Sequence, residues 1–281
     1  MVKLAENRYG KSRVRLVRVR RHPDHDELRE WTVRILLQGD FECCFRDGDN
    51  SKILPTDTMK NTVYALARNS QASCIEEFAS EISTFLLNRN PQLTAAEVEV
   101  SETPWDRAVV AGKPHPAAFL QSTRELHTTK VAQERGAAAV VMSGLDNLVI
   151  LKTSGSAFTG YIKDSFTTLP ETRDRLFGTA LRARWTYSSG SLSFAALRAK
   201  IRDLLLAAFA VHQSESVQHT LYAMAQRALE QVSEISDIHL TMPNKHCLLV
   251  DLSRFGQDNP NEIFVPTDEP HGYIEARVAR D

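Results

Sequence analysis

Two side chains between residues 148 and 175 have the chemistry to hold a flat, negatively charged ring. Phe158 follows the buried-strand run Leu148–Lys152 and a polar turn, so its aromatic face is expected beside polar backbone at a loop edge. Arg175 adds a planar cationic fork farther along the same segment. A stacking ring and a guanidinium suit a planar, anionic heteroaromatic ligand, so we expect the fold to bring Phe158 and Arg175 together.

Five other polar residues could serve such a ligand, although each also has a plainer structural explanation. Taken alone, Lys11 is typical of a solvated lysine near a chain start, and Asn244 of a turn residue. Gln218 alone would be a surface residue in the first turn of a helix. Thr56 and Asp57 are good helix caps, and the free N–H groups of the helix that they begin could also face a ligand.

Short motifs spread over nearly the whole chain resemble those of the urate oxidase (uricase) family. They are Tyr9-Gly10-Lys11, Thr56-Asp57, the run L-V-x-L-K-T-S-x-S at 148–156 with Phe158, Tyr161, Phe166, Leu169 and Arg175 after it, Ser216-Val217-Gln218, and Asn244-Lys245-His246. Two positions depart from the family pattern. Cys247 stands where relatives often have an aromatic residue, and Thr159 stands where some have tryptophan. Both positions lie beside the site, so these departures affect packing more than chemistry.

The resemblance implies a catalytic group made of Lys11, Thr56 and His246. In this interpretation Lys11, as a neutral amine, takes a proton from the substrate through Thr56. His246 then passes the proton on. Electron-rich substrate reduces dioxygen directly, so the resemblance implies urate and dioxygen as partners, no cofactor and no metal. The products are 5-hydroxyisourate and hydrogen peroxide.

The resemblance also implies six substrate-binding residues. Arg175 and Gln218 pair with the edge of the ring, and Phe158 stacks on its face. Backbone groups of Asp57 and Val217 contact the purine, and Asn244 touches the dioxygen or water site. In the family, Lys11, Thr56 and Asp57 come from one subunit and the other site residues from its neighbour, so the resemblance implies a homotetramer with active sites at subunit interfaces.

Two alternatives remain open from the sequence. One is an enzyme of the same fold that acts on another planar heterocycle, a pterin or a purine. Such enzymes usually anchor the ring with a glutamate, whereas Arg175 and Gln218 suit an anionic, carbonyl-rich ring. The other is a non-catalytic purine-binding tunnel protein, which would need no Lys11, Thr56 and His246 together.

Composition narrows the class of protein further. The chain has 281 residues, a net charge of −1 and 42% apolar residues, which gives no global support for nucleic-acid binding. Its longest apolar run, 204–211, is too short to cross a bilayer. The four cysteines show no CxxC spacing, and the His22–Asp26 segment is expected to be a solvated loop, so we predict no metal site. The last three residues, 279–281, are not a peroxisomal tripeptide, and we expect a cytoplasmic, bacterial-type enzyme.

The elements that must position these residues indicate an α+β fold. Residues 1–135 and 136–281 each read as strand, strand, helix, helix, strand, strand, which predicts two tandem units. This order resembles the tunnelling fold (T-fold) of the uricase family. The resemblance implies antiparallel sheets, helices on the outer face, and a barrel closed by oligomerisation. The arginines at 13, 15, 18 and 20 are expected to line the tunnel.

Local patterns predict individual elements. A long hairpin is expected over residues 13–37. Because two apolar residues adjoin at Leu16-Val17, its first strand is expected either to contain a bulge there or to have one wet, partly charged side. Helices are expected to begin near Thr56, over 73–88 with Ser73 and Glu76 as a capping box and Glu76 facing water, and over 216–232. Strands are expected at 137–142 and 148–151, and a turn at Pro243-Asn244 before a strand over 246–252.

Overall fold

Two long antiparallel strands open the fold in the computed structural model, which describes residues 2–190 and 192–280. They are β1 (Tyr9–Arg21) and β2 (Asp26–Gly39). The predicted apolar face of β2 is confirmed, because alternate residues from Trp31 to Leu37 are buried. The hairpin prediction is therefore correct in both its strands and its buried face.

The irregularity in β1 lies earlier than predicted. Lys11 pairs with Ile35, but the next pair is Val14 with Val33, so two residues of β1 face one residue of β2. Arg13, inside this bulge, has φ 58°. Pairing through 16 and 17 is regular, so a bulge at that point is wrong, whereas the alternative of one wet side agrees with the exposed residues 15, 17 and 19.

The position of the bulge decides which arginines share a face. Arg18 and Arg20 both donate to the carbonyl oxygen of Ser70, at 2.9 and 2.6 Å, and so lie on the helix side. Arg15 lies on the other face and pairs with Glu30 at 2.8 Å. The expectation that one arginine series lines a tunnel was therefore wrong, because 15 and 18 are an odd number of residues apart in a regular strand.

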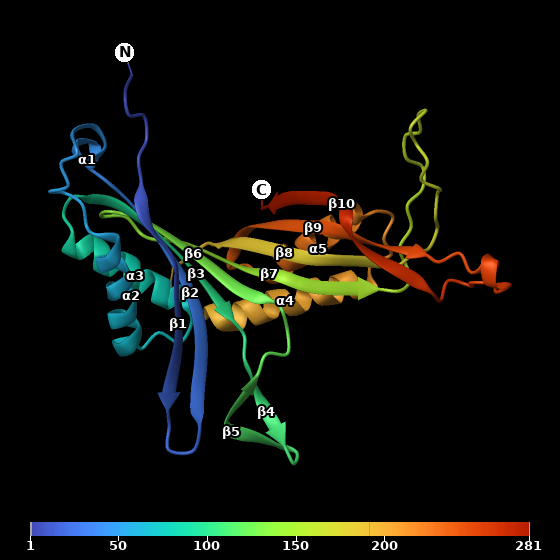
Figure 1. Ribbon diagram of the computed structural model, residues 1–281, viewed down its shortest axis with the longest axis horizontal. Coiled ribbons are helices and arrows are strands. Elements are labelled where there is room, and N and C mark those ends of the chain that lie inside the picture. Colours follow the sequence, from blue (N-terminus) through green and yellow to red (C-terminus); the bar gives the residue numbers. More distant parts are fainter. Residues whose placement is uncertain (1, 191, 281) are drawn as a thin grey trace. The chain divides into compact units, whose positions relative to one another are not determined.

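Three helices follow, α1 (Glu42–Asp47), α2 (Thr56–Asn69) and α3 (Ile75–Arg89). In Figure 1, α2 and α3 lie along one side of the strands of this part of the chain, and they pack on β1 and on β3 with β6. Helix α2 begins at Thr56 as predicted, although Pro55 occupies the N-cap position without a side-chain cap.

The predicted capping box of α3 is shifted by one residue. Cys74 is the N-cap, and the carboxylate of Glu77 accepts hydrogen bonds from the N–H and the hydroxyl of Ser73 at 2.7 and 3.0 Å. Glu76 is buried instead of facing water, and its carboxylate accepts a hydrogen bond from Ser143. The expectation for Glu76 was wrong because Glu77, one residue later, makes the capping contact, and neighbouring side chains on a helix point about 100° apart.

Two further strands, β3 (Leu93–Thr103) and β6 (Leu126–Glu134), follow in the first part of the chain and give the strand order β1-β2-β3-β6. All three pairings are antiparallel. Between β3 and β6 the chain forms a separate hairpin, β4 (Asp106–Val110) and β5 (Lys113–Leu120).

The second half contributes strands in the order β7-β8-β9-β10. They are β7 (Val140–Lys152), β8 (Phe177–Tyr187), β9 (Ile235–Leu249) and β10 (Phe264–Ala279), with a short 3-10 helix at Ser253–Phe255. Helices α4 (Phe194–Val211) and α5 (Val217–Gln231) join β8 to β9. Phe209 of α4 contacts Phe177 of β8 at 5.2 Å between ring centroids, and α5 packs on β9 and β10.

Two predicted strands are one strand in the structure. The segments expected at 137–142 and 148–151 both belong to β7, which runs through Asn147 with φ 57°. Between β7 and β8, residues 153–176 leave the sheet, and this excursion carries Phe158 and Arg175.

The fold is α+β with antiparallel pairing, as predicted, and the strand, strand, helix, helix, strand, strand order recurs in both halves. By contacts, the chain divides into one unit of Met1–Gly144 with Thr186–Ala196 and a second of Leu145–Trp185 with Leu197–Asp281. The division into duplicated halves at residue 135 stays a prediction.

Candidate active site

Phe158 and Arg175 meet in the excursion between β7 and β8. The guanidinium carbon of Arg175 lies 5.3 Å from the centroid of the Phe158 ring. Phe158 and Thr172 exchange two backbone hydrogen bonds, at 2.8 and 3.1 Å. These bonds join the two arms of the loop beside Phe158 and Arg175. The ring of Tyr161 stacks on Phe158 at 4.8 Å and 15°. The fold therefore places a flat ring beside a planar cation, as the sequence predicted.

The guanidinium of Arg175 is half-buried and lacks a counterion. Burial lowers the pKa of Arg175. Among the residues that the structure describes, no carboxylate lies within ion-pair distance of Arg175, and its buried Nε has no hydrogen-bond partner. A buried polar atom without a partner is costly, so this guanidinium is suited to an incoming anion.

The start of α5 lies close to the same loop. Ser216 is its N-cap, and the Ser216 hydroxyl oxygen accepts from the N–H of His219 at 3.1 Å. Ser214 exchanges backbone hydrogen bonds with the loop, donating to Gly155 at 3.0 Å and accepting from Ala157 at 2.7 Å. The segment that leads into α5 is thereby tied to the loop of Phe158, and the first-turn N–H groups at 217 and 218 have no partner within the helix. Val217 is buried and Gln218 is exposed.

Asn244 and His246 lie on β9, which corrects a sequence prediction. The strand runs unbroken from Ile235 to Leu249, so the turn expected at Pro243-Asn244 was wrong. The irregularity is in β10, where pairing jumps from Thr267, opposite His246, to Gly272, opposite Asn244. Because they are two positions apart on one strand, the half-buried Asn244 and His246 share a face.

Lys11 and Thr56 are positioned by one residue, Tyr9. The Tyr9 hydroxyl donates to the carbonyl oxygen of Leu54 at 3.1 Å and accepts from the Leu54 N–H at 2.8 Å, which ties β1 to the segment leading into α2. Tyr9 and Lys11 lie on the face of β1 that α2 covers. At Gly10 a Cβ would lie only 1.8 Å from the carbonyl oxygen of Ile35, so this glycine lets β1 and β2 approach closely.

The carboxylate of Asp57 is engaged within α2. It pairs with Lys60 and accepts from Asn61 at 2.9 Å. The hydrogen bond from Lys60, with a smaller contribution from the charge of Lys11, lowers the pKa of Asp57. Its side chain is therefore occupied, whereas its backbone N–H lies in the first turn, where helical partners are missing.

The predicted site residues fall into two groups. Lys11, Thr56 and Asp57 belong to the first unit. The other six belong to the second: Phe158, Arg175, Val217, Gln218, Asn244 and His246. Sequence reasoning missed the residues that hold these groups in place, Tyr9, Asp174 and Ser214. Their only signal in the sequence was position, next to or within the motifs.

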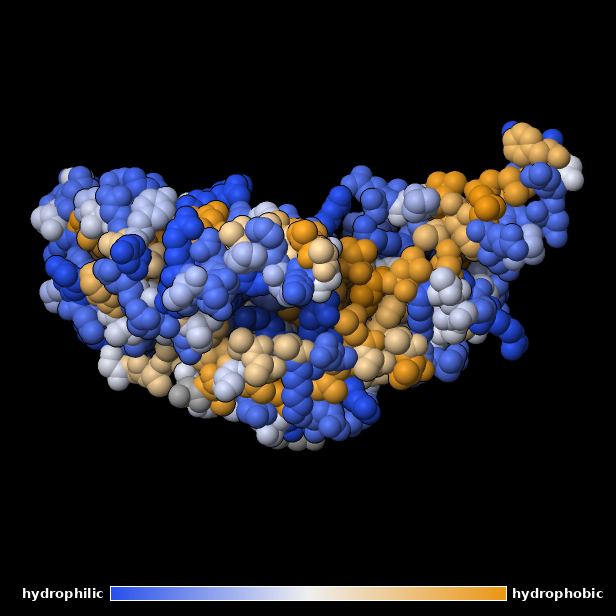
Figure 2. Space-filling view, turned by 90° about the horizontal axis from the view of Figure 1, so that it is seen from below, coloured by the Kyte–Doolittle hydropathy of each residue, from blue (hydrophilic) through white to orange (hydrophobic). Residues whose placement is uncertain are grey.

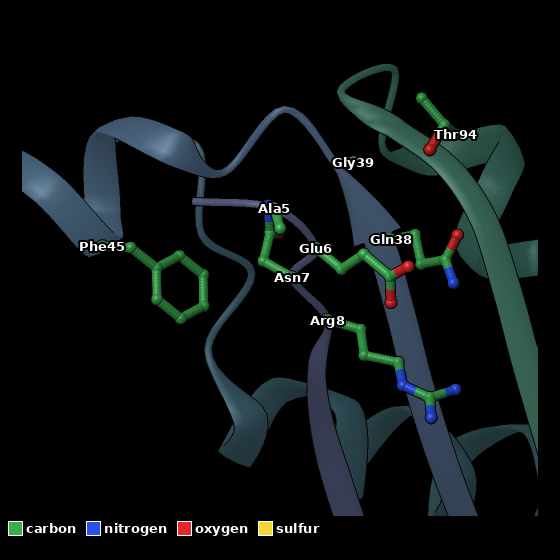
Figure 3. A pocket seen from close by; sticks show the side chains of 8 residues that line it. All are labelled: Ala5, Glu6, Asn7, Arg8, Gln38, Gly39, Phe45 and Thr94. Atoms are coloured by element: carbon green, nitrogen blue, oxygen red, sulfur yellow. The ribbon is translucent and has the colours of Figure 1, made fainter. Parts of the chain in front are cut away.

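A pocket of about 850 Å³ lies at the N-terminal segment, and none of the predicted site residues lines it. Figure 3 shows that Glu6, Arg8 and Gln38 extend into it and that Phe45 of α1 lines its far side. Within residues 2–190 and 192–280, no helix is long and apolar enough to span a membrane. The same residues contain no group of His, Cys, Asp or Glu side chains that could hold a metal ion.

Comparison with known proteins agrees with the motifs. The uricase family model matches residues 7–132 and 141–275. The chain is 40% identical to the uricase of Arthrobacter globiformis, over 100% of this chain and 91% of that one, and 36% identical to the uricase of Dictyostelium discoideum, over 100% and 98%. The crystal structure of the Arthrobacter globiformis uricase superposes with a TM-score of 0.94 at 39% identity, covering 100% of this chain and 96% of that one. This chain therefore belongs to the uricase family.

Proposed function

We propose that this chain oxidises urate with dioxygen and water to 5-hydroxyisourate and hydrogen peroxide, without a cofactor. The observation that carries the proposal is the unpaired, half-buried Arg175 beside the ring of Phe158. Because the chain belongs to the uricase family, we take this pair as the binding site for the flat urate anion.

Recognition of urate follows from ordinary side-chain chemistry. Arg175 donates two parallel hydrogen bonds to the anionic edge of the ring, and Phe158 stacks on its face. Gln218 both donates and accepts along the same edge. The N–H of Val217 adds the positive end of the α5 dipole, which favours an anion.

The chemistry begins with removal of a second proton from urate. Lys11, as a neutral amine, takes this proton through the hydroxyl of Thr56, and His246 passes it on. The dianion then gives an electron pair to dioxygen held near Asn244. Dioxygen becomes hydrogen peroxide by taking the proton removed from urate and one proton from water, and the remaining hydroxide of that water adds to C5.

The site is assembled between subunits of a homotetramer in this proposal. Lys11, Thr56 and Asp57 lie in one unit of the chain and the ring-binding residues in the other, which allows each group to face the complementary group of a neighbouring copy. Strands β1 and β10 are the outermost in their units, and pairing between copies would remove these edges.

Exposed apolar surface also supports assembly. Figure 2 shows apolar surface gathered over part of the second unit. The exposed apolar side chains of this unit include Val149, Leu151, Leu248 and Val265. Leu248 and Val265 are cross-strand partners on β9 and β10. A cytoplasmic location stays a prediction.

The alternative substrates are not favoured. A pterin or guanine-like ring would need a free carboxylate as its anchor, but Asp57 is paired with Lys60 and Asn61. A binding protein without catalysis would not need Lys11 and Thr56 held together by Tyr9.

One assay tests the proposed function. Purified protein in aerated buffer should consume urate and dioxygen in equal amounts and release an equal amount of hydrogen peroxide. Lys11→Met should lower kcat at saturating urate by roughly a hundredfold or more, the usual contribution of a general base. Lys3→Met, an exposed lysine in the same N-terminal segment, is the matched control. A Lys11→Met variant with most of its turnover, or active protein that holds a stoichiometric flavin, iron or copper, would overturn the proposal.

A further inference from the structure

The carboxylate of Asp174 has no part in the proposed chemistry, yet it organises the loop that carries Phe158. Its Oδ1 accepts hydrogen bonds from the N–H groups of Gly155 and Ser156, at 2.7 and 3.3 Å. Gly155 has φ 72°, and a Cβ there would lie 3.1 Å from Oε1 of Gln213. The turn at 155 and 156 therefore needs both a glycine and an external acceptor for its N–H groups.

A second set of hydrogen bonds joins the same turn to α5. Ser214 is buried, and its backbone bonds to Gly155 and Ala157 form a short parallel bridge. Its hydroxyl donates to the carbonyl oxygen of Ser216 at 2.9 Å, the residue that caps α5. The position of the turn at 155 and 156 therefore also fixes where the N-terminus of α5 begins.

A third set closes the loop beside Arg175. Phe158 and Thr172 exchange two backbone hydrogen bonds, and the Thr172 hydroxyl donates to the carbonyl oxygen of Asp174 at 2.8 Å. Asp174 thus bonds to both arms of the loop, to Gly155 and Ser156 through its carboxylate and to Thr172 through its carbonyl. The lowered pKa of Arg175 is due to burial, with no contribution from the charge of the neighbouring Asp174.

We infer that Asp174 is a positioning residue that sets the urate-binding face before urate arrives. It fixes the spacing of Phe158, Arg175 and the start of α5, so that the ligand does not have to order them. This inference rests on the proposed function, because it assigns a role toward the same ligand. Asp174 contacts neither the substrate nor the reacting atoms and acts only through these three segments.

Binding of urate without turnover provides the direct test. In buffer freed of dioxygen, Asp174→Ala should weaken urate binding by about tenfold or more, since two backbone donors lose a charged acceptor. Asp174→Asn keeps an oxygen acceptor at the same place and should bind within about threefold of the parent. Asp164→Ala is the matched control, because Asp164 accepts from Phe166 N–H at 2.9 Å in the same excursion but bonds to none of the three segments.

Steady-state kinetics and a double-mutant cycle separate positioning from a general loss of structure. Asp174→Ala should raise KM for urate with a much smaller effect on kcat, because lost preorganisation weakens substrate and transition state alike. The effect of Asp174→Ala should shrink in a Phe158→Ala background, since Asp174 acts partly through that ring. Additive effects in this cycle, or a loss confined to kcat, would contradict the inference.

The outcomes also distinguish this inference from the proposed function. If Arg175→Gln weakens urate binding and Asp174→Ala does not, the positioning role is wrong and the binding face stands. If neither variant weakens binding, the binding face itself is wrong. Should Asp174→Ala not fold, Asp174→Glu takes its place: a longer side chain with the same charge misplaces the acceptor and should bind urate about tenfold more weakly. Parent-like binding by Asp174→Glu would overturn the inference.

Discussion

The hydroxyl of Tyr9 bonds to both backbone polar groups of a single residue, Leu54. It donates to the carbonyl oxygen and accepts from the N–H. The ring is fixed edge-on against Phe41, with centroids 4.8 Å apart at 82°. Burial raises the pKa of Tyr9, so the hydroxyl keeps its proton at neutral pH and can fill both roles. This contact joins the strand of Lys11 to the helix start at Thr56.

Removal of that hydroxyl should therefore loosen the proposed proton-transfer pair. Tyr9→Phe is expected to lower kcat by about tenfold with little change in KM, because the urate-binding residues lie on other segments. Steady-state kinetics check this. Tyr64→Phe is the matched control, since Tyr64 also links α2 to β1, through a long 3.5 Å contact with Arg15, but away from the helix start. Equal kcat values for Tyr9→Phe and the parent would contradict a positioning role.

Arg175→Gln should weaken urate binding by roughly a hundredfold, because a bidentate, charged pair is replaced by a neutral amide. The measurement is a titration with urate in the absence of dioxygen. Arg173→Gln is the control, since Arg173 is exposed two residues earlier in the same loop and should leave the affinity unchanged. An unchanged affinity for Arg175→Gln would remove the basis of the proposed site.

Co-expression of two impaired variants, assayed at urate concentrations too low to fill the Arg175→Gln site, tests whether sites are shared between subunits. Lys11→Met and Arg175→Gln change different groups of the site. If each site takes Lys11 from one copy and Arg175 from the next, random mixed tetramers should regain about one quarter of the parent activity. Tagging the two chains differently allows mixed assemblies to be purified and assayed. Mixed tetramers without any regained activity would show that both residues come from the same chain.

Glu102 should make the fold sensitive to acid. Burial alone would raise the pKa of Glu102, but contacts from His127 (3.5 Å), Arg29 (3.1 Å) and Trp31 (3.1 Å) outweigh it and together lower the pKa to about 2. An unfolded glutamate titrates near ~4.3, so this stabilisation, on the order of 3 kcal/mol, is present above that pH and is lost as the pH falls toward 2.

Denaturant unfolding of Glu102→Gln measures this contribution. The variant should be less stable than the parent at pH 7, and the difference should shrink below about pH 4. Glu99→Gln, on the same strand, changes a partly exposed pair with Arg34 and should cost far less. A difference between Glu102→Gln and the parent that is constant from pH 7 to pH 3 would contradict the prediction.

The sequence predicted elements wherever apolar periodicity was regular. The alternation from Trp31 to Leu37 and the helix beginning at Thr56 are examples. Prediction from the sequence failed where pairing with a distant strand decides the local structure. The bulge after Lys11 depends on register with β2, and β9 continues through Pro243 because β10 takes up the irregularity. Strand β10 itself has little apolar alternation, with prolines at 266 and 270, so no pattern pointed to it.

Some residues of the candidate site could be predicted from the sequence, and others could not. The ring and guanidinium of Phe158 and Arg175 could be paired from residue type, and the structure brings them together. Lys11, Gln218 and Asn244 have plain explanations by themselves, so only motif resemblance singled them out. Tyr9 and Asp174 were missed because they bond to backbone atoms, whose positions no local pattern reveals.

The extra residue in β1 marks a point where the chain length can change without turning Lys11 over. Lys11 and Val14 both face α2 despite their odd separation, because two residues of β1 there oppose one in β2. Deletion of Ser12 or Arg13 would leave one residue opposite Arg34 and restore regular alternation, so Lys11 would still face α2. Loss of one residue between 11 and 14 should therefore be tolerated in descendants of this chain, whereas a deletion between 14 and 21 would turn the side chains on one side of it to the opposite face.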